Sequence, residues 1–168
     1  MTNHEHFMKQ ALQEARNALA ENEFPVGCVL VCDNEVVARG RRLNSTAQSR
    51  NELDHAEIIA LRYLFASRPD INPARLTAYC TMEPCLMCYA ALLLSRIRTI
   101  VYAYEDAMGG GTGLSRTGLT PLYTQANIEV IPHVLRSESL ALFKEFFQNP
   151  AHSYWQDSYL TQYTLSQS

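Results

Sequence analysis

Three residues of this chain carry side chains that commonly bind a transition metal, and a carboxylate lies close to one of them. The candidate ligands are His55, Cys85 and Cys88, and Glu57 follows the histidine by two positions. One imidazole and two thiolates suit a tetrahedral Zn²⁺ whose fourth position stays open for water, which is typical of catalytic rather than structural zinc sites. Iron and copper are compatible with the sequence, but this ligand set favours zinc.

Glu57 gives the candidate metal site a group that can move protons. Zinc lowers the pKa of a bound water to about 7, and a nearby carboxylate can accept that proton and deliver it to a leaving group. Alone, the Cys85-x-x-Cys88 spacing is also typical of redox motifs, and His55-x-Glu57 is common where surface helices begin. Together, with Pro84 before the first cysteine, they match the pattern of enzymes that hydrolytically remove an amino group from a nucleobase.

A predicted helix over 85–95 positions the two cysteines. Pro84 suits the first helical position, where its missing N–H costs nothing. Cys85 and Cys88 then lie on one face of the first turn. The positive end of this helix favours the thiolate form that zinc requires.

A second predicted helix, over 54–67, begins beside the histidine. Residues two positions apart are about 200° apart around a helix, so spacing alone does not place His55 and Glu57 on one face. Asp54 suits a helix cap, and a role in contacting the substrate is the alternative.

The rest of the chain alternates between strand and helix patterns. Helices are predicted over 4–22, 54–67, 85–95 and 136–147, and strands over 26–32, 35–39, 77–81, 98–104 and 127–131. This alternation predicts helices on both faces of a mostly parallel sheet. We expect residues 1–168 to form a single zinc-dependent deaminase domain, in which 148–168 is an aromatic segment that can cap the pocket.

The chain resembles the cytidine/deoxycytidylate deaminase superfamily, and within it the branch of tRNA adenosine deaminases, guanine deaminases and fungal-type cytosine deaminases. The matching stretches are Phe24-Pro25-Val26-Gly27, Asn44, 54–61, 81–88, Ser95-Arg96-Ile97 and Asp106-Ala107. The resemblance implies an α/β fold, a three-layer α/β/α sandwich with a mixed five-stranded sheet (cytidine deaminase-like). It also implies one Zn²⁺ per chain and a homodimer, with helix 85–95 and the segment around Arg96 as the candidate interface.

The composition of the chain indicates the cellular compartment in which we expect the protein. The chain has 168 residues and five cysteines, an odd number, and it lacks a basic segment followed by an apolar core at its start. Its longest apolar stretches fall far short of the roughly 20 residues that a membrane span needs. A reducing cytoplasm is therefore the expected setting, with no membrane partner.

Four residues are candidates for substrate binding by resemblance. Asn44 would hydrogen-bond the base or its sugar, although an asparagine before Ser and Thr also suits a turn. Asp106 would approach the bound nucleoside, and a solvated loop aspartate is the alternative. Trp155 and Asp157 resemble the aromatic C-terminal segment that closes over the pocket of free-base deaminases. An aromatic stripe packed on the core or on a partner subunit is the alternative for that pair.

The glycine-rich segment 109–113 lacks the Lys-Ser/Thr of a phosphate-binding loop. ATP binding is therefore not predicted, and a flexible loop near the pocket mouth is expected. The arginines gather at 39–42 and at 96–98. Such groups are usually solvated faces, and they are also the expected contacts if the substrate is RNA.

Two hypotheses about the substrate remain open. The net charge of −3, the two lysines and the aromatic C-terminus favour a free nucleobase or nucleoside, because RNA binding relies on basic surface. The segments 95–97 and 106–107 favour the alternative, a tRNA-specific adenosine deaminase that converts the wobble adenosine to inosine and acts on a flipped-out base. We lean to the small molecule. A non-catalytic, zinc-stabilised module is a third possibility, but it would have no use for Glu57.

Overall fold

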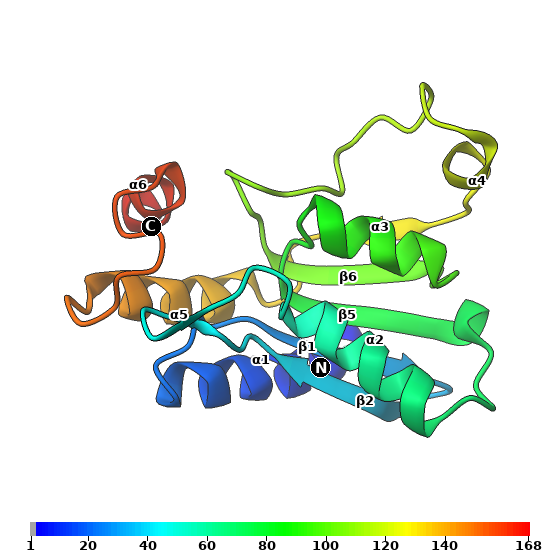
Figure 1. The fold of residues 1–168 in the computed structure, drawn as a ribbon, viewed down its shortest axis with the longest axis horizontal. Coiled ribbons are helices and arrows are strands. Elements are labelled where there is room, and N and C mark those ends of the chain that lie inside the picture. The colour runs from blue at the N-terminus through cyan, green and yellow to red at the C-terminus, as the bar shows by residue number, and fades with distance from the viewer. Residues whose placement is uncertain (1–2) are drawn as a thin grey trace.

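The computed structural model describes residues 3–168, and a five-stranded sheet lies at its centre in the order β2-β1-β5-β6-β7 (Figure 1). The strands of this sheet are β1 (Gly27–Cys32), β2 (Glu35–Arg41), β5 (Leu76–Met82), β6 (Thr99–Tyr104) and β7 (Glu129–Ile131). The helices are α1 (Asn3–Ala20), α2 (Ala56–Ser67), α3 (Leu86–Leu94), α4 (Pro121–Thr124), α5 (Arg136–Gln148) and α6 (Tyr159–Ser166). A short hairpin, β3 (Ser45–Thr46) with β4 (Ser49–Arg50), and a 3₁₀ turn, Pro73–Arg75, complete the elements.

The sheet is mixed, as the resemblance implies. β1 pairs antiparallel with both β2 and β5, whereas β6 pairs parallel with β5 and with β7. The prediction of a mostly parallel sheet was wrong because β1 also pairs antiparallel with β5, so that only the pairings of β6 are parallel in the described sheet. The hairpin of β1 and β2, with its turn at Asp33 and Asn34, agrees with the paired strands that the sequence pattern predicts. Its two turn residues, Asp33 and Asn34, have φ values of 50° and 66°, the conformation that two-residue hairpin turns require. Helix α2 then crosses from β2 to β5, and α3 crosses from β5 to β6.

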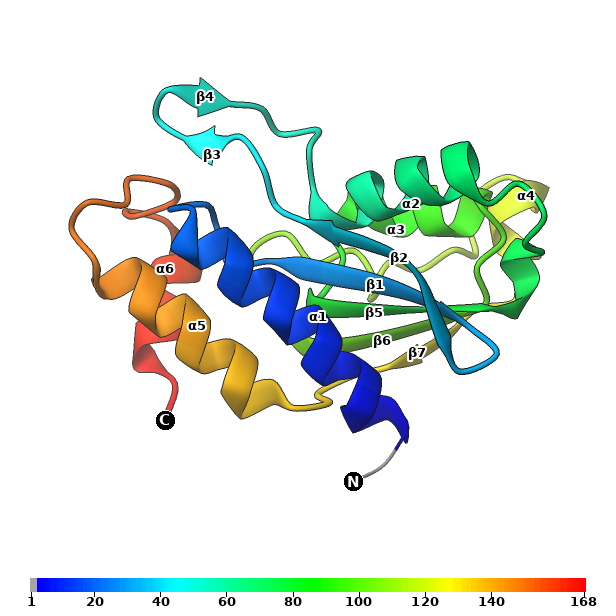
Figure 2. The same cartoon turned by 90° about the horizontal axis from the view of Figure 1, so that it is seen from below.

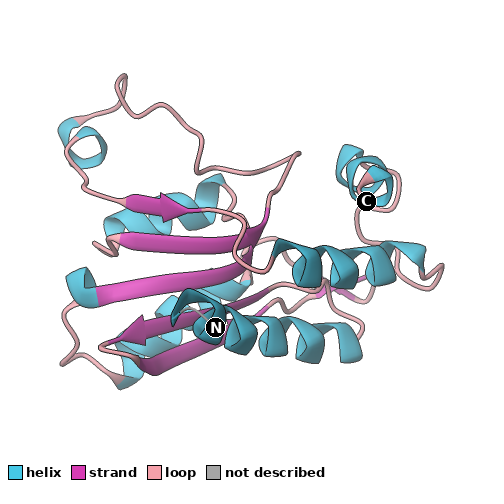
Figure 3. Ribbon diagram, turned by 180° about the vertical axis from the view of Figure 1, so that it is seen from behind, coloured by secondary structure: helices cyan, strands magenta, loops and turns pink. Residues whose placement is uncertain are grey.

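Helices cover both faces of the sheet. Figure 2 shows α2 and α3 on one side of the strands and α1 and α5 on the other. In Figure 3, which views the molecule from behind, the helix that begins at the N-terminus, α1, lies between the viewer and the sheet. Strand β1 is buried on both faces. Leu30 belongs to the apolar cluster that includes Leu61 of α2 and Leu92 of α3, whereas Val29 belongs to the cluster that includes Leu12 of α1. Burial on both faces explains why this strand is a continuous apolar run.

A close contact fixes the start of α2 against the sheet. A Cβ atom at Gly40 in β2 would lie 2.1 Å from the carbonyl oxygen of Ala56, the first residue of the helix. Only a glycine permits this approach of backbone to backbone. The first turn of α2, which follows His55 and contains Glu57, therefore rests directly on β2.

The C-terminal segment contains a helix that the sequence pattern did not predict. Helix α6 packs against α5 and lies beyond the end of the sheet (Figure 1). Glu105, just after β6, joins them: its carboxylate accepts hydrogen bonds of 2.8 Å from Arg136 Nε in α5 and from the Tyr163 hydroxyl in α6. None of the helices in the described part of the chain is long and apolar enough to cross a membrane.

The Glu105 contacts predict a pH-dependent contribution to stability. Partial burial opposes ionisation, but hydrogen bonds from Arg136, the backbone and Tyr163 lower the pKa of Glu105 from 4.5 to about 2. This stabilisation is therefore fully present above about pH 4.5 and is lost as the pH falls towards 2. We expect Glu105→Gln to lower the free energy of unfolding by about 1–3 kcal/mol at pH 7. The difference from the unsubstituted protein should shrink below pH 4.5.

Urea denaturation across a pH series measures this difference. Glu145→Gln, at an exposed position of α5, is the matched control and should show no such gap. A gap for Glu105→Gln that stays constant from pH 7 to pH 2 would contradict the assigned ion pair.

Candidate active site

His55, Cys85 and Cys88 come together at one end of the sheet. The Nδ1 atom of His55 lies 3.5 Å from the sulfur of each cysteine, and the three ligand atoms all lie within 4.8 Å of one another. Zinc bonds of about 2.1 Å to nitrogen and 2.3 Å to sulfur, set at tetrahedral angles, place these atoms about 3.6 Å apart. The nitrogen–sulfur distances therefore fit a tetrahedral zinc ion. Among residues 3–168, no other His, Cys, Asp or Glu residues form such a group.

Two helix N-termini supply the three side chains. His55 precedes α2 and Cys85 precedes α3, and both have extended backbone with ψ values of 152° and 170°. Cys88 lies in the first turn of α3. The prediction that Pro84 is the first helical residue was wrong, because α3 begins at Leu86 and Cys85 is its non-helical cap residue. The extended backbone at His55 also means that helical spacing does not constrain its direction relative to Glu57.

The thiol of Cys85 has a lowered pKa, which suits it to bind a metal cation. A hydrogen bond from the Cys88 thiol and the contact with His55 lower the pKa of Cys85 to about 4, even though burial opposes this shift. A thiol with such a pKa is a thiolate at neutral pH, which is the form that ligates a metal.

Glu57 faces the same space as the candidate ligands. Its side chain is only 3% exposed, and it lines one cavity together with His55 and Cys85. Burial raises the pKa of its carboxyl group. A raised pKa makes a carboxylate a stronger proton acceptor than a solvated glutamate, which suits it to take a proton and return it.

The cavity has a volume of about 160 Å³, smaller than the roughly 300–1,000 Å³ of most small-molecule pockets. A single planar base is a group of suitable size for it. Its lining residues are Phe24, Val26, Arg42, Glu52, His55, Ala56, Glu57, Met82, Glu83, Cys85, Asp106, Met108, Gly109, Tyr154, Trp155 and Leu160.

Two of the four predicted substrate-binding residues line this cavity and two do not. Asp106 lines it, and burial raises the pKa of its carboxyl group. Its Oδ1 atom accepts hydrogen bonds from the backbone N–H groups of residues 108 and 109. Trp155 lines the cavity with 44% of its surface exposed. Asp157 is exposed and is not among the lining residues.

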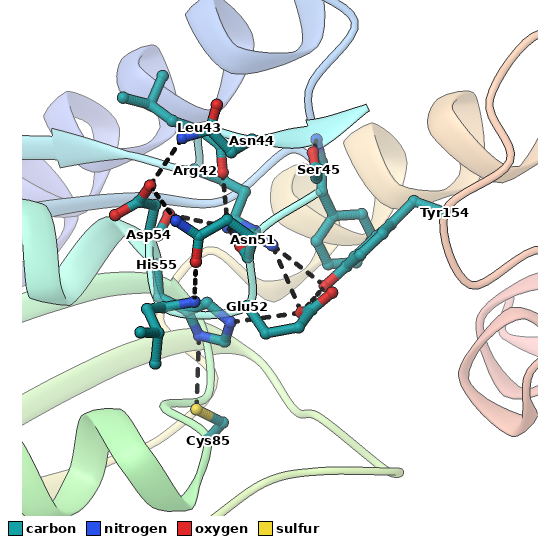
Figure 4. A network of polar contacts seen from close by, with 12 residues as sticks. Arg42, Leu43, Asn44, Ser45, Asn51, Glu52, Asp54, His55, Cys85 and Tyr154 are labelled. Carbon is teal, nitrogen blue, oxygen red and sulfur yellow. Dashed lines mark hydrogen bonds and ion pairs between the residues drawn. The ribbon is translucent and has the colours of Figure 1, made fainter. Parts of the chain in front are cut away.

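Asn44 also lies outside the cavity lining, and its amide is used within the loop before α2 (Figure 4). Its Nδ2 atom donates to Asp54 at 2.7 Å, and its Oδ1 atom accepts from the Ser49 hydroxyl at 2.5 Å. Asp54 accepts a second bond of 2.7 Å from Asn51. The prediction that Asp54 caps α2 was wrong, because α2 has no side-chain cap and this carboxylate holds two asparagines instead.

Arg42 is a site residue that the sequence did not reveal. It is 2% exposed, and its Nη1 atom donates to the carbonyl oxygens of Leu43, Asn51 and Asp54 at 2.6, 2.8 and 3.0 Å. These bonds hold together the two ends of the loop that leads to His55. A buried arginine is rare unless it is paired. Because Arg42 lies in a run of arginines that resembles a solvated surface, the sequence did not indicate that this one is buried.

The neighbouring arginines are also engaged. Arg41 forms a 2.7 Å ion pair with Glu21, which follows α1, and Arg39 lies 3.8 Å from Glu14 of α1. The arginine cluster at 39–42, a possible RNA contact in the sequence, is therefore partly neutralised by these two glutamates and partly buried.

A glycine-rich loop after β6 lies directly on the segment that bears the cysteines. The Glu83 carboxylate accepts 3.2 Å hydrogen bonds from the backbone N–H groups of Asp106 and Thr112. Gly111 donates to the Pro84 carbonyl at 2.9 Å, and a Cβ atom added to it would lie 2.7 Å from the backbone of Leu86. The loop that carries Asp106 is thereby fixed to the cysteine segment, and Gly111 is required for the close approach.

This contact predicts the effect of a single methyl group. Gly111→Ala forces the loop away from α3, because backbone atoms cannot yield as a flexible side chain can. We expect a loss of about 1–3 kcal/mol in the free energy of unfolding, together with weaker zinc binding. Gly113→Ala is the control, since a Cβ atom there would meet nothing within 4 Å. Equal stability and equal zinc affinity of the two variants, from urea denaturation and chelator competition, would refute the packing argument.

Comparison with known proteins places this site in a family. Residues 1–104 match the family described as the cytidine and deoxycytidylate deaminase zinc-binding region. A tRNA-specific adenosine deaminase of Bacillus subtilis is 33% identical over 148 residues, which are 88% of this chain and 91% of that protein. The tad2 subunit of a Schizosaccharomyces pombe tRNA-specific adenosine deaminase is 35% identical over 87% of this chain, which corresponds to 37% of that longer protein.

Solved structures agree with the sequence relatives. A structure from work on A-to-I editing by tRNA:A34 deaminases aligns with a TM-score of 0.70 and 34% identity, over 82% of this chain and 98% of that one. A guanine deaminase from Nitrosomonas europaea aligns with a TM-score of 0.66 over 84% of this chain and 83% of that one, but its 22% identity reflects the fold alone. With the predicted ligand trio gathered beside a base-sized cavity, these matches show that the chain belongs to the cytidine and deoxycytidylate deaminase family of hydrolytic deaminases.

Proposed function

We propose that this protein is a zinc-dependent adenosine deaminase that acts on tRNA and converts the wobble adenosine to inosine. The observation that carries the proposal is the match to the B. subtilis tRNA-specific adenosine deaminase over nearly the full length of both chains. The free-base hypothesis favoured by the sequence has weaker support, since the guanine deaminase neighbour shares 22% identity with this chain.

The residues of the site divide the reaction between them. His55, Cys85 and Cys88 would hold one Zn²⁺, which supplies a Lewis acid that lowers the pKa of a water molecule to about 7. Glu57 would accept one proton of the attacking water and pass it to the ring nitrogen. It would then carry the second proton, from the newly added hydroxyl group, to the amino group, which leaves as ammonia. Burial of Glu57, which raises its pKa, suits it to both steps.

The cavity suits a base that has left its stack. An enzyme acting on a base within RNA must take the nucleotide out of the stack and hold only the base in its pocket, which agrees with a volume of about 160 Å³. Trp155 and Met108 line the cavity while 44% and 39% exposed. Arg50, also exposed, lies 5.5 Å from the ring of Tyr154 at the cavity. Exposed aromatic and cationic groups of this kind stack on unpaired bases.

A homodimer is part of the proposal. Helix α3 has buried residues towards the sheet, but Leu86 and Leu94 are 55% and 54% exposed. These apolar side chains support α3 as part of a contact between two copies of the chain.

Substitution of the general base separates chemistry from metal binding. Glu57→Gln should retain zinc, because the substituted side chain is not a ligand, and should reduce kcat by about 10²–10⁴-fold or more. Glu138→Gln, at an exposed position of α5, should leave both quantities unchanged. Metal analysis and single-turnover deamination measure the two effects. A Glu57→Gln variant with normal kcat would remove Glu57 from the mechanism.

The substrate is tested with one panel under one set of conditions. It contains a tRNA anticodon stem-loop with adenosine at the wobble position, the same stem-loop with guanosine there, and free cytosine, guanine, adenine and their nucleosides. We expect ammonia and inosine only from the first RNA, no turnover after zinc is removed by a chelator, and recovery when zinc is restored. Turnover of a free base or nucleoside without turnover of the stem-loop would establish the small-molecule alternative.

A further inference from the structure

The imidazole of His55 has a defined environment on both sides. Its Nδ1 atom faces the sulfurs of Cys85 and Cys88 at 3.5 Å. Its Nε2 atom, on the opposite edge of the ring, lies 4.0 Å from Oε2 of Glu52. Figure 4 shows the ring between the glutamate and the Cys85 sulfur. The distance of 4.0 Å is too long for a direct hydrogen bond, so Glu52 acts on the ring through its charge.

Glu52 is held in this position by two other residues. The Tyr154 hydroxyl donates a 2.6 Å hydrogen bond to the same Oε2 atom, and Arg42 Nη2 lies 3.4 Å from it. Arg42 is itself fixed by three backbone carbonyl groups. The Glu52 side chain is 52% exposed, yet the oxygen that faces His55 has a fixed place because its partners are buried.

Tyr154 belongs to a distant part of the chain. It lies between α5 and α6, and its ring packs 5.1 Å from that of Phe24 and 5.5 Å from the guanidinium of Arg42. These contacts hold the ring itself. Its hydroxyl group accepts from Arg42 Nη2 at 3.4 Å and donates to Glu52, so that the C-terminal segment contacts the carboxylate beside His55 through this group.

We propose that Glu52 is a positioning residue for His55, and that Tyr154 makes the C-terminal segment part of the metal site. A carboxylate beside Nε2 favours the tautomer that carries its proton there, which leaves the lone pair of Nδ1 directed at the metal. The inference rests on the zinc site of the proposed function. It adds two residues that touch neither the metal nor the substrate's reacting atoms.

Two conservative substitutions test the proposal in the full-length protein. Glu52→Gln removes the charge and keeps the shape, and Tyr154→Phe removes the hydroxyl group and keeps the ring contacts. We expect Glu52→Gln to weaken zinc binding by about 10-fold, the lower end of the losses caused by removing a hydrogen-bonded partner of a ligating histidine, because Glu52 acts on the ring from a longer distance. Tyr154→Phe should cause a smaller loss in the same direction. Competition with a chromogenic chelator measures the affinities, and the visible spectrum of the Co²⁺-substituted protein should shift in both variants.

Matched controls isolate the effect from general damage. Tyr163→Phe removes a hydroxyl group bonded to Glu105, and Glu21→Gln removes a charge paired with Arg41. Both controls should keep the zinc affinity and the Co²⁺ spectrum of the unsubstituted protein. Unchanged affinity and spectrum in a folded Glu52→Gln variant, checked by circular dichroism, would overturn the proposal. A change in Glu52→Gln but none in Tyr154→Phe would overturn the part assigned to the C-terminal segment. If the unsubstituted protein bound no zinc, the proposed metal site itself would fail.

Discussion

Ligands thirty positions apart in the chain must place their atoms 3.5 Å from each other, and much of the architecture serves this requirement. Neither helix provides this placement alone, because His55 and Cys85 lie in extended backbone just before α2 and α3. Their relative position depends on how closely each helix start approaches the sheet. The contact of Gly40 with Ala56 fixes the first of these, and the seating of the glycine-rich loop on Pro84 and Leu86 fixes the second.

A buried positive charge organises the other side of the site. Burying an unpaired guanidinium group in the protein interior costs free energy. Arg42 avoids this cost by donating hydrogen bonds to backbone carbonyl groups of the loop between β2 and α2. The same loop bears Asn44 and Asp54, whose mutual hydrogen bond shapes it further. The polar side chains around His55 thus form a supporting frame that leaves Nδ1 of the ring facing the two cysteines.

The sequence predicted the long elements and the ligand trio because each has a local signal. Apolar runs bounded by turn residues mark β1, β5 and β6, and two short spacings mark His55, Cys85 and Cys88. Helix α6 and the β3–β4 hairpin were not predicted, since short elements without a strong apolar period depend on tertiary contacts. The role of Glu52 had no local signal, because it depends on a contact with Tyr154, more than a hundred positions away. The acceptors of Arg42 are backbone carbonyl groups, which a pattern of side chains does not reveal.

The residues that line the cavity come from two parts of the chain, one inside the segment that matches the family and one after it. The match to the family covers residues 1–104 and contains His55, Glu57 and both cysteines. Asp106, Trp155 and other wall residues, among them Met108, Gly109, Tyr154 and Leu160, lie beyond it. The reacting groups and this part of the wall therefore lie in different segments of the chain. A substitution beyond residue 104 can reshape the cavity without altering a candidate metal ligand or Glu57.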